Sequence, residues 1–206
     1  MIIIVFKMNC CQKKSILVET NCGAVRGSKM KTKKGKKIFA FRGIPYAKPP
    51  VGELRFRRSE PMMPWEGVLN CKKEAKKAYQ PNVLAPESPF RDGGEDCLYL
   101  NVYTKEYPQV GDGPVSSEEP RLLPVIVFLH GGAFVVGSCE SMLYGPQVIL
   151  DRDVILVGVN YRLGAFGFLS LESDDAPGIT IQIKYFVLYF VDWLQATLDF
   201  MISIWR

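Results

Sequence analysis

Short stretches that alternate apolar and polar residues occupy the first part of the chain. Residues 15–20 and 22–26 flank a tight turn at Asn21, and residues 37–42 carry a further strand pattern that ends at Gly43. The segment that follows contains three prolines, which oppose both strand and helix continuation and hold the backbone extended. This region therefore predicts a small antiparallel meander.

The pattern changes beyond Pro124, where apolar residues run on without alternation. Residues 125–129 and 154–159 are continuous apolar runs, typical of strands buried on both faces of a parallel or mixed sheet. A glycine-rich turn and a short helical candidate at 147–151 lie between them, and residues 97–103 form an earlier strand pattern. Together these elements predict an α/β fold with a mixed sheet.

Length and composition agree with one globular domain, either complete or a large one cut short. The chain has 206 residues, of which 48% are hydrophobic and 23% charged, so it can bury a sizeable core and is not of the disordered or low-complexity class. Its net charge is +5, and much of the excess lies in the lysine-rich run from Ser28 to Lys37. Because no aromatic residues interleave with these lysines, we interpret the run as a solvated loop rather than a nucleic-acid or anionic-membrane patch.

Histidine and cysteine usage limits the chemistry that the chain can perform. His130 is the single histidine, and the six cysteines fit no zinc-binding spacing, so we predict neither a metal site nor a cofactor. Six cysteines in 206 residues are also far fewer than a disulfide scaffold requires.

The segment His130–Phe134, with the sequence HGGAF, carries the strongest chemical signal. It follows directly on the first continuous apolar run. Successive glycines at the carboxyl end of a strand allow a sharp turn and leave main-chain N–H groups accessible, which suits stabilisation of a developing negative charge. The alternative is a tight turn without a chemical role. The position of the segment directly after a buried strand favours a turn that stabilises an oxyanion, as in lipases and esterases.

Five blocks of sequence, in order, resemble the N-terminal part of type-B carboxylesterases, the family that includes cholinesterases and insect esterases. The resemblance covers roughly residues 16–178 and implies an α/β-hydrolase fold, with a mixed, mostly parallel sheet preceded by the small antiparallel meander. The five blocks are Phe41–Phe56, Pro64–Gly67, Glu95–Val102, His130–Phe134 and Val159–Leu169.

The resemblance also implies roles for individual residues. Gly132 and Ala133 match the positions whose main-chain N–H groups donate to the oxyanion, and Gly131 allows the turn. In the same way, Arg55 and Glu95 match a structural ion pair.

Cys97 matches a cysteine that in many members forms a disulfide with an upstream cysteine. Here that upstream position lies near Ala78, and Cys71 comes several residues too early, so the resemblance does not establish a disulfide.

The catalytic triad of the family has no counterpart in these residues. Family esterases use a serine in a G-x-S-x-G turn, then an acidic residue and a histidine, all downstream of the five blocks. No G-x-S-x-G occurs in the sequence, and the one imidazole is already part of the oxyanion turn. We therefore expect a serine carboxylic-ester hydrolase by family whose 206 residues are inactive alone, because they lack nucleophile, acid and base.

The resemblance ends sharply after Gly178, which divides the chain into residues 1–178 and an unmatched apolar tail, 179–206. We expect this tail to derive from intron read-through, a frameshift or an assembly error rather than to be a selected C-terminus. Two other readings stay open: a non-catalytic esterase-like binding or adhesion protein, and a truncated product that does not fold.

The expected partners are small carboxylic esters, with no nucleic acid and no membrane span, and the sequence makes no prediction of oligomeric state. No secretory leader pattern and no N-glycosylation motif occurs, which favours a cytoplasmic location.

Overall fold

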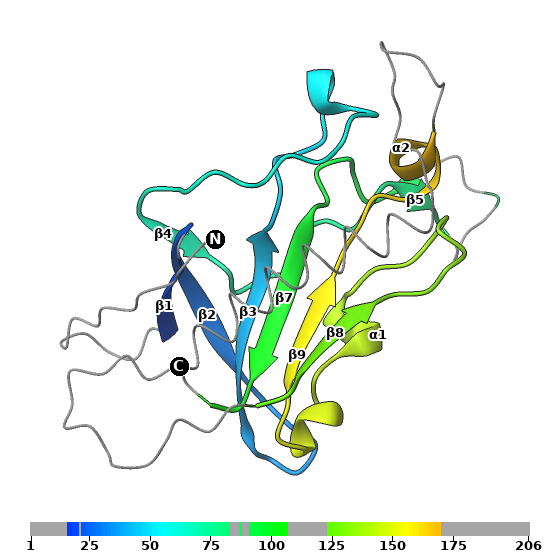
Figure 1. Ribbon diagram of the computed structural model, residues 1–206. Coiled ribbons are helices and arrows are strands. Elements are labelled where there is room, and N and C mark those ends of the chain that lie inside the picture. Colours follow the sequence, from blue (N-terminus) through cyan, green and yellow to red (C-terminus); the bar gives the residue numbers. More distant parts are fainter. Residues whose placement is uncertain (1–15, 21, 83–86, 88–90, 107–122, 170–206) are drawn as a thin grey trace.

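A single twisted sheet organises the protein (Figure 1), which is described here from a computed structural model that covers residues 16–20, 22–82, 87, 91–106 and 123–169. Seven strands of the protein form this sheet, in the order β1-β2-β3-β7-β9-β8, with β4 beside β2. The short strands β5 and β6 pair with each other in a separate sheet. The strands are β1 (Ile16–Thr20), β2 (Gly23–Lys31), β3 (Lys37–Pro45), β4 (Val68–Asn70), β5 (Gln80–Pro81), β6 (Arg91–Asp92), β7 (Tyr99–Thr104), β8 (Val125–Leu129) and β9 (Ile155–Val159). The helices are η1 (Gly52–Leu54), α1 (Ser141–Tyr144), η2 (Ile149–Asp151) and α2 (Gly164–Phe168).

The predicted meander is confirmed, but its strands are longer than the sequence pattern indicated. β1, β2 and β3 pair antiparallel in sequence order. β2 continues to Lys31 because its polar residues pair with β3, so the solvated-loop interpretation of the lysine run was wrong for Ser28–Lys31. β3 does not end at Gly43, since a register shift between Phe41 and Ile44 lets the strand continue beside β7.

The sheet is mixed, as predicted, but in the described residues it is mostly antiparallel rather than mostly parallel. β8 and β9 pair parallel, whereas β7 runs antiparallel to both of its neighbours, β3 and β9. Parallel neighbours need a crossover connection. The segment between β8 and β9 supplies one, whereas turns join β1 to β2 and β2 to β3.

The two continuous apolar runs behave differently. All five residues of β9 are buried, as predicted for a strand covered on both faces. On β8, by contrast, Ile126 and Leu129 are 37% and 38% exposed. The difference follows from position, because β9 lies between two strands and β8 pairs only with β9 among the described strands.

Alternate residues of β9 point into two separate core clusters. Ile155, Val157 and Val159 belong to one cluster, and Leu156 belongs to another together with Leu150 of η2. The helical candidate at 147–151 is thus realised as the 3-10 turn η2, while α1 had no signal in the sequence. Among the described helices, none combines the length and the apolar character that a membrane crossing requires.

Candidate functional site

The chain turns sharply after β8, and the backbone of this turn is strained. Gly132 has φ +124°, and the next two residues, Ala133 and Phe134, have φ 52° and 60°, in the left-handed region. This conformation is uncommon for any residue with a side chain and most unfavourable for a bulky one. Each such residue costs about 1–3 kcal/mol, and residues of this kind cluster at functional sites.

Glycine is required at two positions of the turn. A Cβ on Gly132 would lie 1.9 Å from the carbonyl oxygen of Val136, and one on Gly137 would lie 2.3 Å from Nδ1 of His130. Gly131, to which the resemblance gave the role of allowing the turn, has no positive φ, and a Cβ there would meet no atom within 4 Å. The sequence pattern gave the sharp turn to Gly131 and Gly132 together, whereas the structure requires glycine at Gly132 and at Gly137, which the pattern did not single out.

Two main-chain donors at the tip of the turn are available. The residues from Gly131 to Val135 are exposed, and the carbonyl of Gly132 accepts from the N–H groups of Val135 and Val136, at 3.0 and 3.1 Å. Within the described part of the chain, no hydrogen bond uses the N–H of Gly132 or of Ala133. Exposed, unused N–H groups on a rigid turn can donate to an anionic oxygen.

Gln80, on β5, holds the far end of the turn. Its buried side-chain amide pairs with both main-chain groups of Gly137: Oε1 accepts from the N–H at 2.8 Å, and Nε2 donates to the carbonyl at 2.9 Å. Nε2 also donates to the carbonyl of Ala78, at 3.0 Å. Gln80 gives no signal in the sequence, because nothing in a local pattern links it to a glycine 57 positions later.

Two residues of the segment after β9 hold the near end. The hydroxyl of Tyr161 donates to the carbonyl of His130 at 2.6 Å, and the N–H of Gly164 donates to the carbonyl of Phe134 at 2.8 Å. The Phe134 ring makes edge contacts with Tyr161 and Phe168, with centroids 6.5 and 5.1 Å away. The turn is thus fixed from β5 on one side and from the β9–α2 segment on the other.

His130 is a buried structural group. Its ring stacks on Tyr161 at a centroid distance of 4.4 Å, and Nδ1 lies 2.9 Å from the carbonyl oxygen of Gly131, which favours the tautomer protonated at Nδ1. Burial lowers the pKa of the imidazole, so the ring is neutral at pH 7. Nε2 is buried and has no partner among the described residues.

The structure places Arg55 and Glu95 in a bidentate ion pair, with Nε–Oε2 and Nη2–Oε1 distances of 2.6 and 2.7 Å. The Arg55 guanidinium also lies over the ring of Phe166 on α2, 5.9 Å from its centroid. Phe56 stacks on the same ring, with the two centroids 5.8 Å apart. These contacts join the proline-rich segment and the segment before β7 to α2, at the same end of the sheet as the turn.

Cys97 lies beside these contacts as a free thiol. Cys71 and Cys97 are both buried, but they belong to different core clusters and neither forms a disulfide. Burial raises the pKa of Cys97 to about 12, so the thiol stays protonated and inert.

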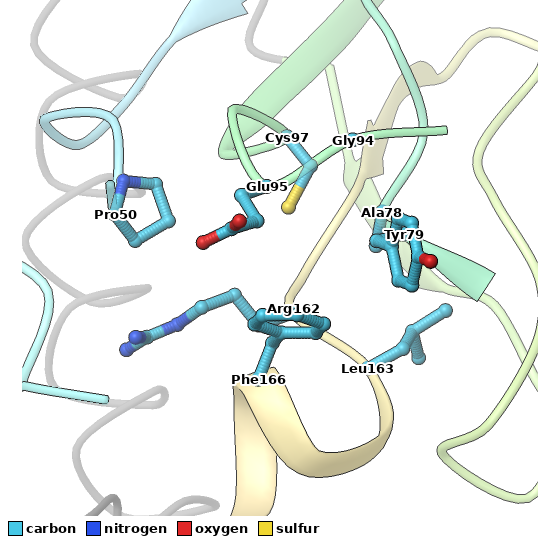
Figure 2. Close-up of a pocket in the computed structure, with 9 residues that line it drawn as sticks. All are labelled: Pro50, Ala78, Tyr79, Gly94, Glu95, Cys97, Arg162, Leu163 and Phe166. Atoms are coloured by element: carbon cyan, nitrogen blue, oxygen red, sulfur yellow. The ribbon is translucent and has the colours of Figure 1, made fainter. Parts of the chain in front are cut away.

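A small cavity adjoins Cys97. Figure 2 shows Cys97 and Arg162 on opposite sides of this space, with the rings of Tyr79 and Phe166 also lining it. Its volume of about 10 Å³ holds about one water molecule, which is too small for an ester substrate. Within the described residues, no cluster of histidine, cysteine or acidic side chains could hold a metal ion.

Comparison with known proteins identifies the family to which this arrangement belongs. Residues 14–179 match the family model described as the carboxylesterase family. The chain belongs to the carboxylesterase family. Juvenile hormone esterase of Tribolium castaneum is 46% identical over 79% of this chain and 26% of its own length, and acetylcholinesterase of Danio rerio is 39% identical over 79% and 26%.

Solved structures confirm the α/β-hydrolase fold of this carboxylesterase-family chain. It matches juvenile hormone esterase from Manduca sexta, solved with OTFP covalently attached, with a TM-score of 0.67 and 39% identity over 80% of this chain. Carboxylesterase EST55 of Geobacillus stearothermophilus gives a TM-score of 0.60 at 33% identity over 79% of this chain. The chain spans 30% of each of these structures, so it corresponds to less than a third of its relatives.

Proposed function

We propose that this chain supplies the oxyanion-stabilising portion of a serine carboxylic-ester hydrolase that acts on small esters. The observation that carries the proposal is the strained, clamped turn after β8, which presents the N–H groups of Gly132 and Ala133 without partners among the described residues. Membership of the carboxylesterase family supports the reaction class.

In the proposed reaction, the turn acts on the tetrahedral intermediate. A serine attacks the ester carbonyl, its proton passes to a histidine base, and the carbonyl oxygen becomes an oxyanion that accepts hydrogen bonds from Gly132 and Ala133. Because the turn is already fixed by Gln80, Tyr161 and Gly164, little reorganisation is needed as the charge develops. Each donor of this kind contributes on the order of 3 kcal/mol to transition-state stabilisation.

The nucleophile, acid and base of this reaction are not among the 206 residues. The sequence has no G-x-S-x-G, and its single histidine is the buried, neutral His130. A pKa lowered by burial, and a ring stacked on Tyr161, suit a structural histidine more than a general base. We therefore infer that the 206-residue protein alone hydrolyses no ester.

A chimera tests the proposal directly. Residues 16–169 would replace the matching segment of the Tribolium castaneum juvenile hormone esterase, and hydrolysis of a short-chain aryl ester would be measured. We expect an active chimera, and a loss of kcat of about 100-fold or more when Gly132→Val displaces the turn. Gly131→Ala is the matched control, because a side chain there meets open space.

Two results would contradict the proposal. One is a chimera that folds, as judged by circular dichroism and thermal unfolding, but does not turn over the ester. The other is full activity of the Gly132→Val chimera. Separately, ester hydrolysis above background by the isolated 206-residue protein, or its labelling by a fluorophosphonate probe, would disprove the inferred inactivity.

A further inference from the structure

The hairpin between β2 and β3 concentrates positive charge at its tip. Six lysines lie within nine residues and all six are exposed, with no acidic residue between them. No ion pair within the described residues involves any of them. We name this surface the lysine tip; it consists of Lys29, Lys31, Lys33, Lys34, Lys36 and Lys37.

Hydrogen bonds give the lysine tip a fixed conformation. Buried Thr32 organises the turn, because its N–H donates to the carbonyl of Lys36 at 2.8 Å and its hydroxyl accepts the N–H of Lys36 at 3.1 Å. The N–H of Lys33 donates to the carbonyl of Gln147 at 2.9 Å, and Nζ of Lys36 donates to the main-chain carbonyl of Asp151 at 3.3 Å. The tip is therefore anchored to the segment around η2.

The pairing of the strands keeps like charges together. Lys31 lies directly opposite Lys37 in the register of β2 and β3. Like charges facing each other across an antiparallel pair destabilise it. The two acidic residues in the segment that anchors the tip form no ion pair with these lysines: Asp153 pairs with Lys105 at 2.5 Å, and Oδ1 of Asp151 is buried.

An exposed apolar side chain lies beside this charge. Val148, next to the residue that accepts the Lys33 N–H, is 60% exposed. Lysines with long apolar stems beside exposed aliphatic side chains suit the interface of an anionic bilayer. The six basic residues are all lysines, without the arginine forks that favour nucleic-acid recognition. Nζ of Lys37 lies 5.7 Å from the centroid of the Phe39 ring, but that ring is buried and not open for a base to stack on.

From these observations we propose that the lysine tip, with Val148, docks the protein on membranes rich in anionic lipid, which replaces the solvated-loop interpretation that the sequence alone favoured. The tip lies at the end of the sheet opposite to the candidate oxyanion turn (Figure 1). β3, which begins at Lys37, runs in the same direction as β8 and β9, whereas the turn follows the end of β8. Docking through the tip leaves that turn facing away from the bilayer, about 20 Å further along the strands. This proposal is independent of the proposed ester chemistry.

Vesicle flotation of the 206-residue protein tests the proposal, with phosphatidylcholine vesicles compared with vesicles that also contain phosphatidylserine. We expect binding only to the anionic vesicles, weakening as salt is raised. Lys33→Gln/Lys34→Gln/Lys36→Gln removes three charges and should weaken binding about 100-fold, at about fivefold per lysine. Val148→Ser should weaken binding at high salt, where the apolar contribution dominates.

A matched triple variant controls for net charge. Lys72→Gln/Lys73→Gln/Lys76→Gln removes the same three charges from exposed positions away from the tip, and should leave binding nearly unchanged. Equal weakening by both triple variants would overturn the proposal, as would no binding to anionic vesicles. Tighter binding to duplex DNA than to those vesicles would assign the tip to nucleic acid instead. Thermal unfolding of each variant shows whether it is folded.

Discussion

Two turns at opposite ends of the sheet are both energetically unfavourable, but in different ways. In the turn after β8 the unfavourable feature is the backbone, because Ala133 and Phe134 have positive φ. At the lysine tip the backbone is an ordinary hairpin, and the unfavourable feature is charge, since Lys31 faces Lys37. The first turn therefore presents main-chain groups held in place, and the second presents side chains to solvent.

The largest expected effect separates the glycines of the first turn. Gly132→Val should lower the free energy of unfolding by about 3 kcal/mol, because its side chain would overlap the Val136 carbonyl on a backbone that only glycine adopts easily. Gly131→Ala should change that energy by less than about 0.5 kcal/mol. Urea unfolding measures both, and equal losses would show that the strain is not localised as described.

Removal of the Gln80 clamp should have the next largest effect. Gln80→Leu leaves the partly buried N–H and carbonyl groups of Gly137 unpaired, which should destabilise the protein by about 2 kcal/mol. Hydrogen exchange of the Gly137 amide should accelerate with it. Gln147→Leu, at a partly exposed position, is the control. An unchanged exchange rate at Gly137 would contradict the clamp.

Acid should weaken the same region through His130. Its pKa in the folded protein is lowered by burial, so the stabilising contribution is complete above the unfolded value of 6.5 and is lost as pH falls toward the lower folded value. The slope is at most about 1.4 kcal/mol per pH unit. Unfolding measured between pH 7.5 and 5 tests this loss, with His130→Gln as the variant that cannot titrate. Because the chain has one histidine, its imidazole NMR signal reports the pKa without assignment ambiguity.

The smallest effect has the opposite sign. Lys31→Glu replaces a like-charged pair by an oppositely charged one, which should stabilise the hairpin by about 0.5 kcal/mol at low salt and less at high salt. Thermal unfolding at two salt concentrations measures this gain, and Lys29→Glu, opposite Phe39 rather than a lysine, is the control. Destabilisation by Lys31→Glu would show that the charges at the tip do not oppose folding.

Local patterns in the sequence predicted the strands and turns whose conformation depends on neighbouring residues. Continuous apolar runs located β8 and β9, and the pair of glycines located the turn between them. The length of β2 could not be predicted from its lysines, because a strand that extends into solvent needs only a partner, and β3 supplies it.

The missed parts of the candidate site depend on contacts distant in sequence. Gln80 and Gly137 meet only in the folded chain, and no local periodicity marks either residue. The glycine at 137 was the one available signal of a constrained position, since it lies against the His130 ring at the end of the turn. The division at residue 178, the origin of residues 179–206 and the cytoplasmic location stay predictions, and the tail lies outside the described residues.

The use of main-chain donors in the turn has a consequence for how sequence variation in this segment should be interpreted. Replacement of Ala133 by any residue other than proline keeps its N–H group, so substitution by glycine or another small residue, which the positive φ tolerates, would leave the proposed chemistry largely intact. The spacing between Gly132 and Gly137 is different, because Gln80 fixes one end and the Val136 carbonyl packs closely against the other. An insertion or deletion of one residue between Gly132 and Gly137 should therefore disrupt the turn. Relatives that carry such a change are expected to have lost its proposed role.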